Sequence, residues 1–256
     1  MKKHTFVILA YQESDDLEEC IKSVLKQSVK SNVLIATSTP NDYIMEISSL
    51  YSLGVMVNES ESNKGNDYNF ALNTIDSPLI TIAHQDDLYD RNYTKEILKK
   101  YKENPDATII FTNNYQIEGD KKILNNRLLR KSRYYLFPLK YKFFQNKKYF
   151  KLRSVRKEKF ICTSSITFVK KNITMPLFPS DIYYDNDWKG LIMLAKKNSH
   201  FVFLDKKLVG YRMENKTFNK DKLAEDEDIL KENYSEWYFE MFIKKSLNKE
   251  RGKVNF

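Results

Sequence analysis

Short, nearly continuous apolar runs recur along the first third of the chain, at residues 5–11, 32–37, 54–58 and 77–84. Such runs are typical of strands that are buried on both faces of a parallel sheet. Between them, apolar residues return every three or four positions, which is the spacing of a helix with one buried face. Strands that alternate with helices in this way predict an α/β domain whose mostly parallel sheet is flanked by helices.

Three helices are predicted between these strands. The first is expected to have Ser14 as its N-terminal cap, with Asp15 and Asp16 in a first turn where negative charge interacts favourably with the helix dipole. The other two are expected at residues 44–53 and 68–75. Because parallel strands end at one edge of a sheet, the polar sequences AYQES, ATSTPND and AHQDD that follow three of the strands should line one crevice.

The pattern changes after residue 113. The remaining chain predicts a basic segment at residues 127–159, a strand-like run at 161–169 and a short apolar helix at 191–197. Two further strand-like runs, at 200–204 and 207–213, and a C-terminal helix, at 221–245, are predicted to follow.

Composition narrows the function classes. Six Gly and six Pro exclude collagen-like and linker classes and leave little room for a phosphate-binding glycine loop. Cys20 and Cys162 lack CxxC spacing, so we expect two small buried side chains and neither a disulfide framework nor a cysteine zinc site. The first apolar run is too short for a signal peptide, and no stretch approaches the ~20 apolar residues of a membrane span. We therefore expect a cytoplasmic protein, or one that contacts membranes only at their surface.

Charge is concentrated in one segment. Residues 127–159 contain thirteen Lys or Arg and a single acidic residue, Glu158, which gives +12, so the rest of the chain carries −3 of the formal net charge of +9. Tyr, Phe and Leu are interleaved with these cations. This pattern fits an anionic membrane surface, which we favour as a partner over the other functional interpretation, a nucleic-acid surface. The remaining interpretation is a helical excursion whose aromatic residues pack on the main domain.

Two pairs of carboxylates are candidates for chemistry. Asp86 and Asp87 directly follow an apolar strand, where a divalent cation held together with substrate phosphates would offset their mutual repulsion. Asp185 and Asp187 occur roughly one hundred residues later at a predicted helix start, and one of them could act as a general base. Helix capping is the structural alternative for both pairs.

At this level of detail the chain resembles a known family. The segments FVILAYQES, NKGNDYNFAL, HQDDLYD, DNDWKGLIMLAKKN and LDKKLVGYR occur in the order and spacing of a family 2 glycosyltransferase with the GT-A architecture, of the bacterial surface-polysaccharide type. The resemblance extends from about Phe6 to Met213. It implies a nucleotide-sugar-binding half at 1–115, a basic aromatic excursion at 116–160, an acceptor and catalytic half at 161–215, and a C-terminal helical extension at 216–256 through which the chain could form oligomers.

The resemblance also implies roles for individual residues. Asp187 would be the catalytic base of an inverting single displacement, and Asp87 would bind Mn²⁺ or Mg²⁺, which offsets the charge developing on the departing nucleoside diphosphate. The donor would be a nucleotide sugar, with a UDP-sugar favoured, and the acceptor a hydroxyl of a glycan or a lipid-linked glycan. The implied nucleotide-sugar contacts are Ala10, Tyr11, Glu13, Ser38, Asp67, Asn69, Gln85 and, near the ribose, Asp86.

Three departures from the family pattern affect this interpretation. The family commonly has an acidic turn that contacts the nucleobase, but here the turn has the sequence ATSTPND, and Asp42 is the nearest acidic residue that could substitute for it. His84 replaces the first Asp of the family's DxDD motif. Glu214 replaces the His of its YRxH motif. These departures motivate one alternative, a catalytically impaired nucleotide-sugar-binding scaffold at the membrane surface. A nucleotidyltransferase is disfavoured because no Gly-rich, Arg-containing loop follows the first strand.

Overall fold

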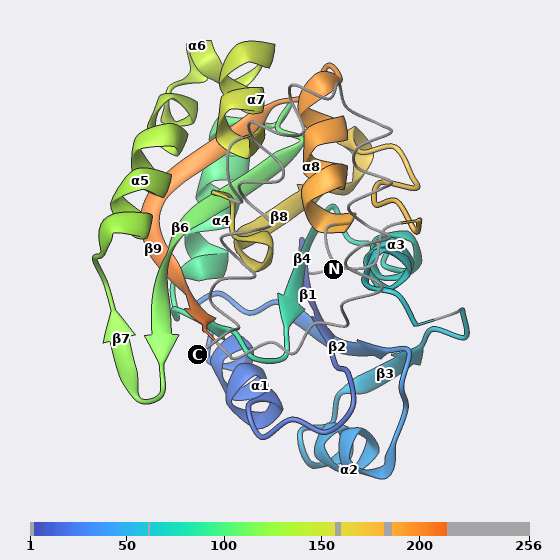
Figure 1. Ribbon diagram of the computed structural model, residues 1–256. Helices are drawn as coiled ribbons and strands as arrows, with labels where there is room; N and C mark the ends of the chain where they lie inside the picture. The colour runs from blue at the N-terminus through green and yellow to red at the C-terminus, as the bar shows by residue number, and fades with distance from the viewer. Residues whose placement is uncertain (1–2, 61, 157–159, 182–185, 214–256) are drawn as a thin grey trace.

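A computed structural model describes residues 3–60, 62–156, 160–181 and 186–213. These residues form a nine-stranded mixed sheet with the strand order β3-β2-β1-β4-β8-β6-β9-β5, and β7 pairs with β6 outside this order. Helices cover the sheet, as Figure 1 shows. The predicted α/β class is therefore confirmed.

The N-terminal half of the sheet is parallel, as the sequence predicts. Val7 of β1 pairs with Leu34 of β2 on one side and with Ile82 of β4 on the other. The elements of this half are β1 (His4–Leu9), α1 (Leu17–Leu25), β2 (Asn32–Thr37), α2 (Asp42–Leu50), β3 (Gly54–Val57), α3 (Lys64–Thr74) and β4 (Leu79–His84). Each predicted strand is present within two residues of its expected ends.

Two helix starts differ from prediction. The N-cap of α1 is Asp16 and not Ser14, whose carbonyl oxygen instead accepts a hydrogen bond from the amide of Leu17 in a turn before the helix. Helix α3 starts four residues earlier than predicted because the side chain of Asn63 caps it, accepting a hydrogen bond from the amide of Gly65.

The second half of the sheet is held together by pairings between distant segments. Strand β8 (Ile166–Val169) lies antiparallel between β4 and β6 (Ile109–Glu118), and β9 (Phe201–Arg212) runs parallel to β6. The predicted strands at 200–204 and 207–213 are thus one strand, which stays paired with β6 through an irregular register between Thr112 and Asn114. The short strands β5 (Leu88–Tyr89) and β7 (Lys121–Ile123) complete the sheet.

Two hydrophobic cores lie on opposite faces of the sheet. One contains Phe6, Leu17 and Tyr93 and packs α1, α2 and α4 (Tyr93–Glu103) against the sheet. The other contains Tyr68 and Trp188 and packs α3 and α8 (Asn186–Lys196). Because the alternate side chains of each central strand enter different cores, these strands read as continuous apolar runs.

The basic segment is helical. It forms α5 (Arg127–Leu136), a 3-10 turn η1 (Phe137–Lys140), α6 (Lys142–Gln145) and α7 (Lys148–Arg156). Its apolar side joins the second core through Leu136, Leu139 and Leu152. Lys151 is buried and its ammonium group donates hydrogen bonds to the carbonyl oxygens of Lys197 and Ser199, at 2.7 and 2.9 Å, just beyond α8.

The predicted C-terminal helix at 221–245, and the oligomer contact assigned to it, lie outside the described residues. Among the helices of the described part, none is long and apolar enough to cross a membrane.

Candidate active site

The carboxyl ends of the first strands meet, as predicted. The side-chain amide of Gln85, after β4, exchanges two hydrogen bonds with the backbone of Tyr11, after β1: the Tyr11 amide donates to Oε1 at 2.8 Å and Nε2 donates to the Tyr11 carbonyl at 3.0 Å. The backbone amide of Gln12 donates to the hydroxyl of Thr39, after β2, at 2.8 Å. Three loops that are distant in sequence therefore form one crevice edge.

Two of the other predicted nucleotide contacts lie at this edge. The backbone amide of Ala10 donates to the carbonyl of Ala36 at 2.9 Å and closes the ends of β1 and β2. Glu13 is exposed and lines a pocket together with Gln12 and Asn41.

Asp67 and Ser38 are in direct contact. The Ser38 hydroxyl donates to Oδ2 of Asp67 at 3.0 Å, and Nδ2 of Asn58 donates to Oδ1 at 2.8 Å. Burial raises the pKa of Asp67, and these two hydrogen bonds oppose the shift. Asn69, by contrast, binds the main chain of Leu177 and Phe178 through both ends of its amide, and so connects α3 to the loop before α8.

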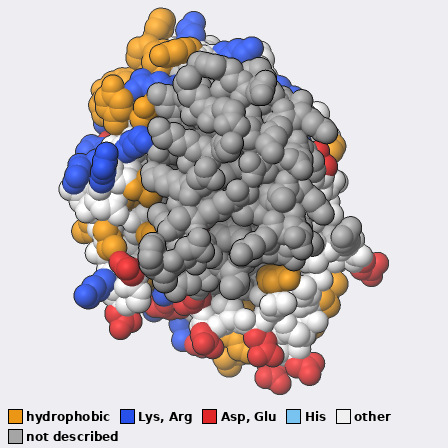
Figure 2. All heavy atoms as spheres, viewed as in Figure 1, with side chains coloured by type: hydrophobic (Ala, Val, Ile, Leu, Met, Phe, Trp, Pro, Cys, Tyr) orange, Lys and Arg blue, Asp and Glu red, His pale blue; other side chains and the backbone are white. Residues whose placement is uncertain are grey.

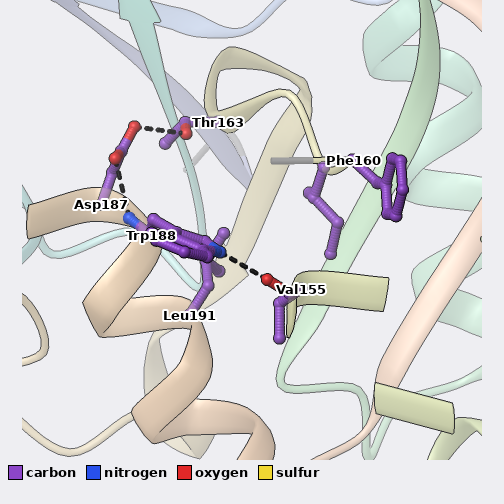
Figure 3. A pocket seen from close by; sticks show the side chains of 7 residues that line it. Val155, Phe160, Thr163, Asp187, Trp188 and Leu191 are labelled. Carbon is purple, nitrogen blue, oxygen red and sulfur yellow. Dashed lines mark hydrogen bonds between the residues drawn. The ribbon is translucent and has the colours of Figure 1, made fainter. Parts of the chain in front are cut away.

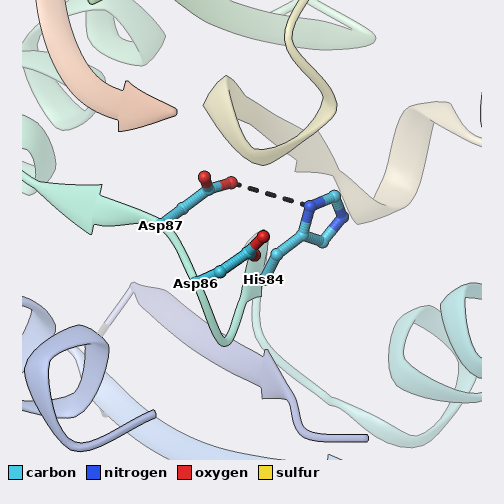
Figure 4. A group of neighbouring side chains, drawn as sticks. All are labelled: His84, Asp86 and Asp87. Carbon is cyan, nitrogen blue, oxygen red and sulfur yellow. Dashed lines mark ion pairs between the residues drawn. The ribbon is translucent and has the colours of Figure 1, made fainter. Parts of the chain in front are cut away.

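The acidic turn after β4 brings three donor groups together. Ligand atoms of His84, Asp86 and Asp87 all lie within 4.8 Å of one another (Figure 4). Carboxylate oxygens and imidazole nitrogen are suitable ligands for Mn²⁺, and carboxylates also for Mg²⁺, so the donor chemistry of the turn fits a divalent cation. Asp86 is partly exposed, whereas Asp87 is completely buried.

Protein groups already bind the buried carboxylate. Oδ1 of Asp87 accepts a hydrogen bond from the backbone amide of Arg212 at 3.2 Å, and Oδ2 accepts one from the hydroxyl of Ser164. The guanidinium group of Arg212 donates to the carbonyl of Asp86 at 3.1 Å and pairs with the carboxylates of Asp16, at 3.0 Å, and Glu19, at 2.7 Å. The end of β9 and the start of α1 therefore fix the acidic turn from two sides.

A chain of hydrogen bonds continues from Asp87 through His84. Because the Ser164 hydroxyl donates to Asp87, its oxygen accepts from Nδ1 of His84, 2.9 Å away, and Nε2 of His84 forms a hydrogen bond with the hydroxyl of Tyr68. The Tyr68 and His84 rings are stacked, with centroids 5.8 Å apart. Burial, followed by the charges of Asp187 and Asp87, raises the pKa of Tyr68, so its hydroxyl stays protonated.

The second carboxylate, Asp187, lies in the first turn of α8. Its Oδ2 accepts a hydrogen bond from the Thr163 hydroxyl at 2.8 Å and lies 3.5 Å from Nζ of Lys64, while its Oδ1 accepts from the backbone amide of Trp188 at 2.7 Å. Figure 3 shows Asp187 and Thr163 facing each other at the wall of a pocket that Trp188 and Leu191 also line. Asp185, the other residue of the predicted pair, lies outside the described residues.

One short turn holds both candidate carboxylates. Thr163 and Ser164 are adjacent in the 3-10 turn η2 (Thr163–Ser165), and each donates its hydroxyl to a different carboxylate, Asp187 and Asp87. The turn itself is fixed because the hydroxyl of buried Tyr89 donates to the Ser164 carbonyl at 2.7 Å. The sequence predicted a strand over 161–169, so its polar positions carried no sign that they would meet these acids.

Solved structures with a similar fold are glycosyltransferases. S. aureus TarS (residues 1–349) has a TM-score of 0.59 and 14% sequence identity, with 91% of this chain and 72% of the TarS chain covered. Its complex with UDP-GlcNAc has a TM-score of 0.61 and 14% identity, with 89% of this chain and 65% of the TarS chain covered. The mannosyltransferase PcManGT from Pyrobaculum calidifontis, in complex with GDP-Man and Mn²⁺, has 0.60 at 12%, over 90% and 62%. For the last two, this chain therefore covers less than two thirds of the solved chain.

Sequence comparison gives the family directly. A search of curated protein sequences finds no match. The family model described as glycosyl transferase family 2, in contrast, matches residues 5–174, which is well over half of the chain and includes the strand ends, the acidic turn and the 163–165 turn. This chain therefore belongs to glycosyl transferase family 2.

Proposed function

We propose that this glycosyltransferase moves a sugar from a nucleoside-diphosphate sugar to an acceptor hydroxyl with inversion at the anomeric carbon. The observation that carries the proposal is the single turn, Thr163–Ser165, that connects the metal-compatible acidic turn to a second buried carboxylate, Asp187. Similar folds solved with UDP-GlcNAc, and with GDP-Man and Mn²⁺, support a nucleotide-sugar donor, and we favour a UDP-sugar.

The donor would bind along the crevice edge. Tyr11, with Gln85 behind it, and the Asp67–Ser38 pair would face the nucleoside. Asp86 and Asp87, beside His84, would hold Mn²⁺ or Mg²⁺, which when bound supplies positive charge against the departing diphosphate. Asp86 is the more accessible carboxylate, so we assign it to the ribose and metal side, with Asp87 as the buried ligand beneath it.

Asp187 would be the general base. As the acceptor oxygen forms its bond to the anomeric carbon, the bond from that carbon to the diphosphate oxygen breaks, and the acceptor proton passes to a carboxylate oxygen of Asp187. Hydrogen bonds from Thr163 and from the Trp188 amide orient this carboxylate before the acceptor arrives. The ammonium group of Lys64 lies 3.5 Å from Oδ2 of this carboxylate.

The decisive experiment combines a panel of UDP-, GDP-, CMP- and dTDP-sugars with Mn²⁺ or Mg²⁺ and measures nucleotide release with and without acceptor. We expect one donor class to be turned over only with metal, and an Asp187→Asn variant to bind it without turnover. Metal-dependent binding without turnover by the unmodified chain would favour the scaffold alternative instead. The biological setting that we propose is bacterial polysaccharide or glycoconjugate synthesis in the cytoplasm, with a glycan or lipid-linked acceptor.

A further inference from the structure

The aromatic residues of the basic segment differ in burial, and Tyr134 of α5 is 67% exposed. Tyr135 and Phe150 pack against the second core. Four others, all within residues 137–149, which we call the tip, are strongly exposed: the exposed fractions are 39% for Phe137, 49% for Tyr141, 72% for Phe143 and 71% for Tyr149. Single exposed apolar side chains are ordinary, but several large rings on one short excursion indicate an interaction surface.

The cations of the tip surround these rings. Lys140, Lys142, Lys147 and Lys148 are all exposed, and no acidic residue occurs anywhere between 127 and 156. The ammonium group of Lys140 lies 5.6 Å from the ring centroid of Phe137, and that of Lys147 lies 5.2 Å from that of Phe143. None of the four lysines forms an ion pair with another described residue.

Other cations of the segment have structural roles. Arg133 makes a bidentate pair with Asp205 of β9, with a shortest contact of 2.7 Å, and Lys151 is buried against the residues that follow α8. The tip lysines are therefore one part of the segment's positive charge that is available to a partner, and the exposed Arg127 and Arg130 of α5 are another. Figure 2 shows Lys and Arg side chains of the segment beside apolar side chains at the upper left, over α5 and α6, whereas most acidic side chains in that view gather at the lower edge around α1 and α2.

We propose that the tip docks on an anionic lipid bilayer surface, with its four aromatic rings at the level of the headgroups and its four lysines against the lipid phosphates. Amphipathic rings prefer the water–lipid interface, and long lysine side chains let the charge reach the phosphates while the ring beside it inserts. The partner is a bilayer and not a nucleic acid because every cation of the tip is Lys, without an Arg fork to bind phosphates or bases in fixed geometry. This proposal goes beyond the glycosyltransferase function and does not depend on it.

The test is co-sedimentation of the full chain with phosphatidylcholine vesicles, with and without one quarter phosphatidylglycerol, from 0.05 to about 0.5 M salt. We expect binding to the anionic vesicles alone, and its loss as salt increases. Each lysine near such a surface strengthens binding about fivefold, so replacing all four tip lysines by Gln should lower the partition coefficient by roughly 600-fold. Phe143→Ser with Tyr149→Ser should lower it about tenfold or more at unchanged charge.

A matched control removes the same charge elsewhere. Lys26, just beyond α1, and Lys95, Lys99 and Lys102, on α4, are exposed, and their replacement by Gln should change the partition coefficient by less than about threefold. An equal loss in this control would mean that overall charge and not the tip binds lipid, and would overturn the proposal. Equal binding to neutral and anionic vesicles, or no binding to anionic vesicles, would overturn the proposal as well. So would a variant with all four tip lysines replaced by Gln that loses RNA binding but still binds anionic vesicles.

Discussion

Replacing Thr163 or Ser164 by Ala should separate two functions that one turn holds together. Each substitution removes one hydroxyl and one hydrogen bond to a carboxylate, Asp187 for Thr163 and Asp87 for Ser164. The two positions are adjacent, both are buried, and both belong to the same 3-10 turn. Any general disturbance of the turn should therefore affect both variants, whereas loss of a specific carboxylate contact should not.

The expected magnitudes follow from burial. A hydrogen bond to a charged group contributes about 1.5–3 kcal/mol, which corresponds to roughly 10- to 100-fold in the constant that depends on it. Asp187 keeps the Trp188 amide and Lys64 after Thr163→Ala, so the lower end applies there. Asp87 has no exposed surface and would keep its contact with the Arg212 amide, so the upper end applies to Ser164→Ala.

The assay compares kcat and donor KM with calorimetric binding of the nucleoside diphosphate in the presence of Mn²⁺. Thr163→Ala should lower kcat about tenfold and leave nucleotide affinity within a factor of about three. Ser164→Ala should weaken metal-dependent nucleotide binding by roughly 100-fold and lower the melting temperature by about 6–12 °C. Thr163→Ser, which keeps the hydroxyl, should restore kcat.

Ser165→Ala is the control, because the Ser165 hydroxyl donates only to the carbonyl of Cys162, at 2.6 Å, and touches neither carboxylate. The reasoning is refuted if Thr163→Ala and Ser164→Ala change the same parameter by the same factor. It is also refuted if Ser165→Ala reproduces either effect, since the turn would then act only as a structural support.

Three further predictions concern single side chains. Asp187→Asn should lower kcat by about 10²–10⁴-fold in steady-state assays while calorimetry shows unchanged nucleotide binding. Burial raises the pKa of Asp67 above its usual 3.8, so ionisation of this residue opposes folding at a pH above the raised value. Asp67→Asn should therefore have a higher melting temperature than the parent protein at pH 7. This difference should vanish near pH 3.8. Burial lowers the pKa of Lys151 from 10.5 to about 8, so this residue makes the free energy of unfolding increase between pH 8 and pH 10.5. In denaturant titrations across this pH range, Lys151→Met should show a smaller increase than the parent protein.

The parallel half of the sheet could be predicted because its signals are local. Each strand from β1 to β4 is an apolar run of its own, and the helices between them carry their own periodicity. Strand β9 could not be read in the same way: Asp205, Lys206 and Lys207 interrupt its apolar run and suggest a break, yet pairing with β6 carries the chain through them as one strand. The deciding interaction is tertiary and leaves no local pattern.

The same distinction between local patterns and tertiary contacts applies to the candidate site. The acidic turn and Asp187 could be selected as candidates from the sequence, since they occur in motifs whose residues are close in sequence. Ser164 and Tyr68 were not, because their importance lies in contacts with His84 across 80 and 16 residues of sequence. A hydroxyl has no charge or periodicity to mark it, so only the fold reveals which serine meets a buried carboxylate.

His84 shows how such contacts accommodate a departure from the family pattern. An Asp at this position would place a third carboxylate within 4.8 Å of Asp86 and Asp87, and the repulsion among them would have to be offset by a bound cation. The imidazole of His84 instead forms hydrogen bonds with Tyr68 and Ser164, and Ser164 in turn donates to Asp87. Hydrogen bonds within the protein thus link His84 and Asp87 to α3 and to the 163–165 turn. The substitution therefore lowers the negative charge available to a metal, and it adds hydrogen bonds that orient the acidic turn.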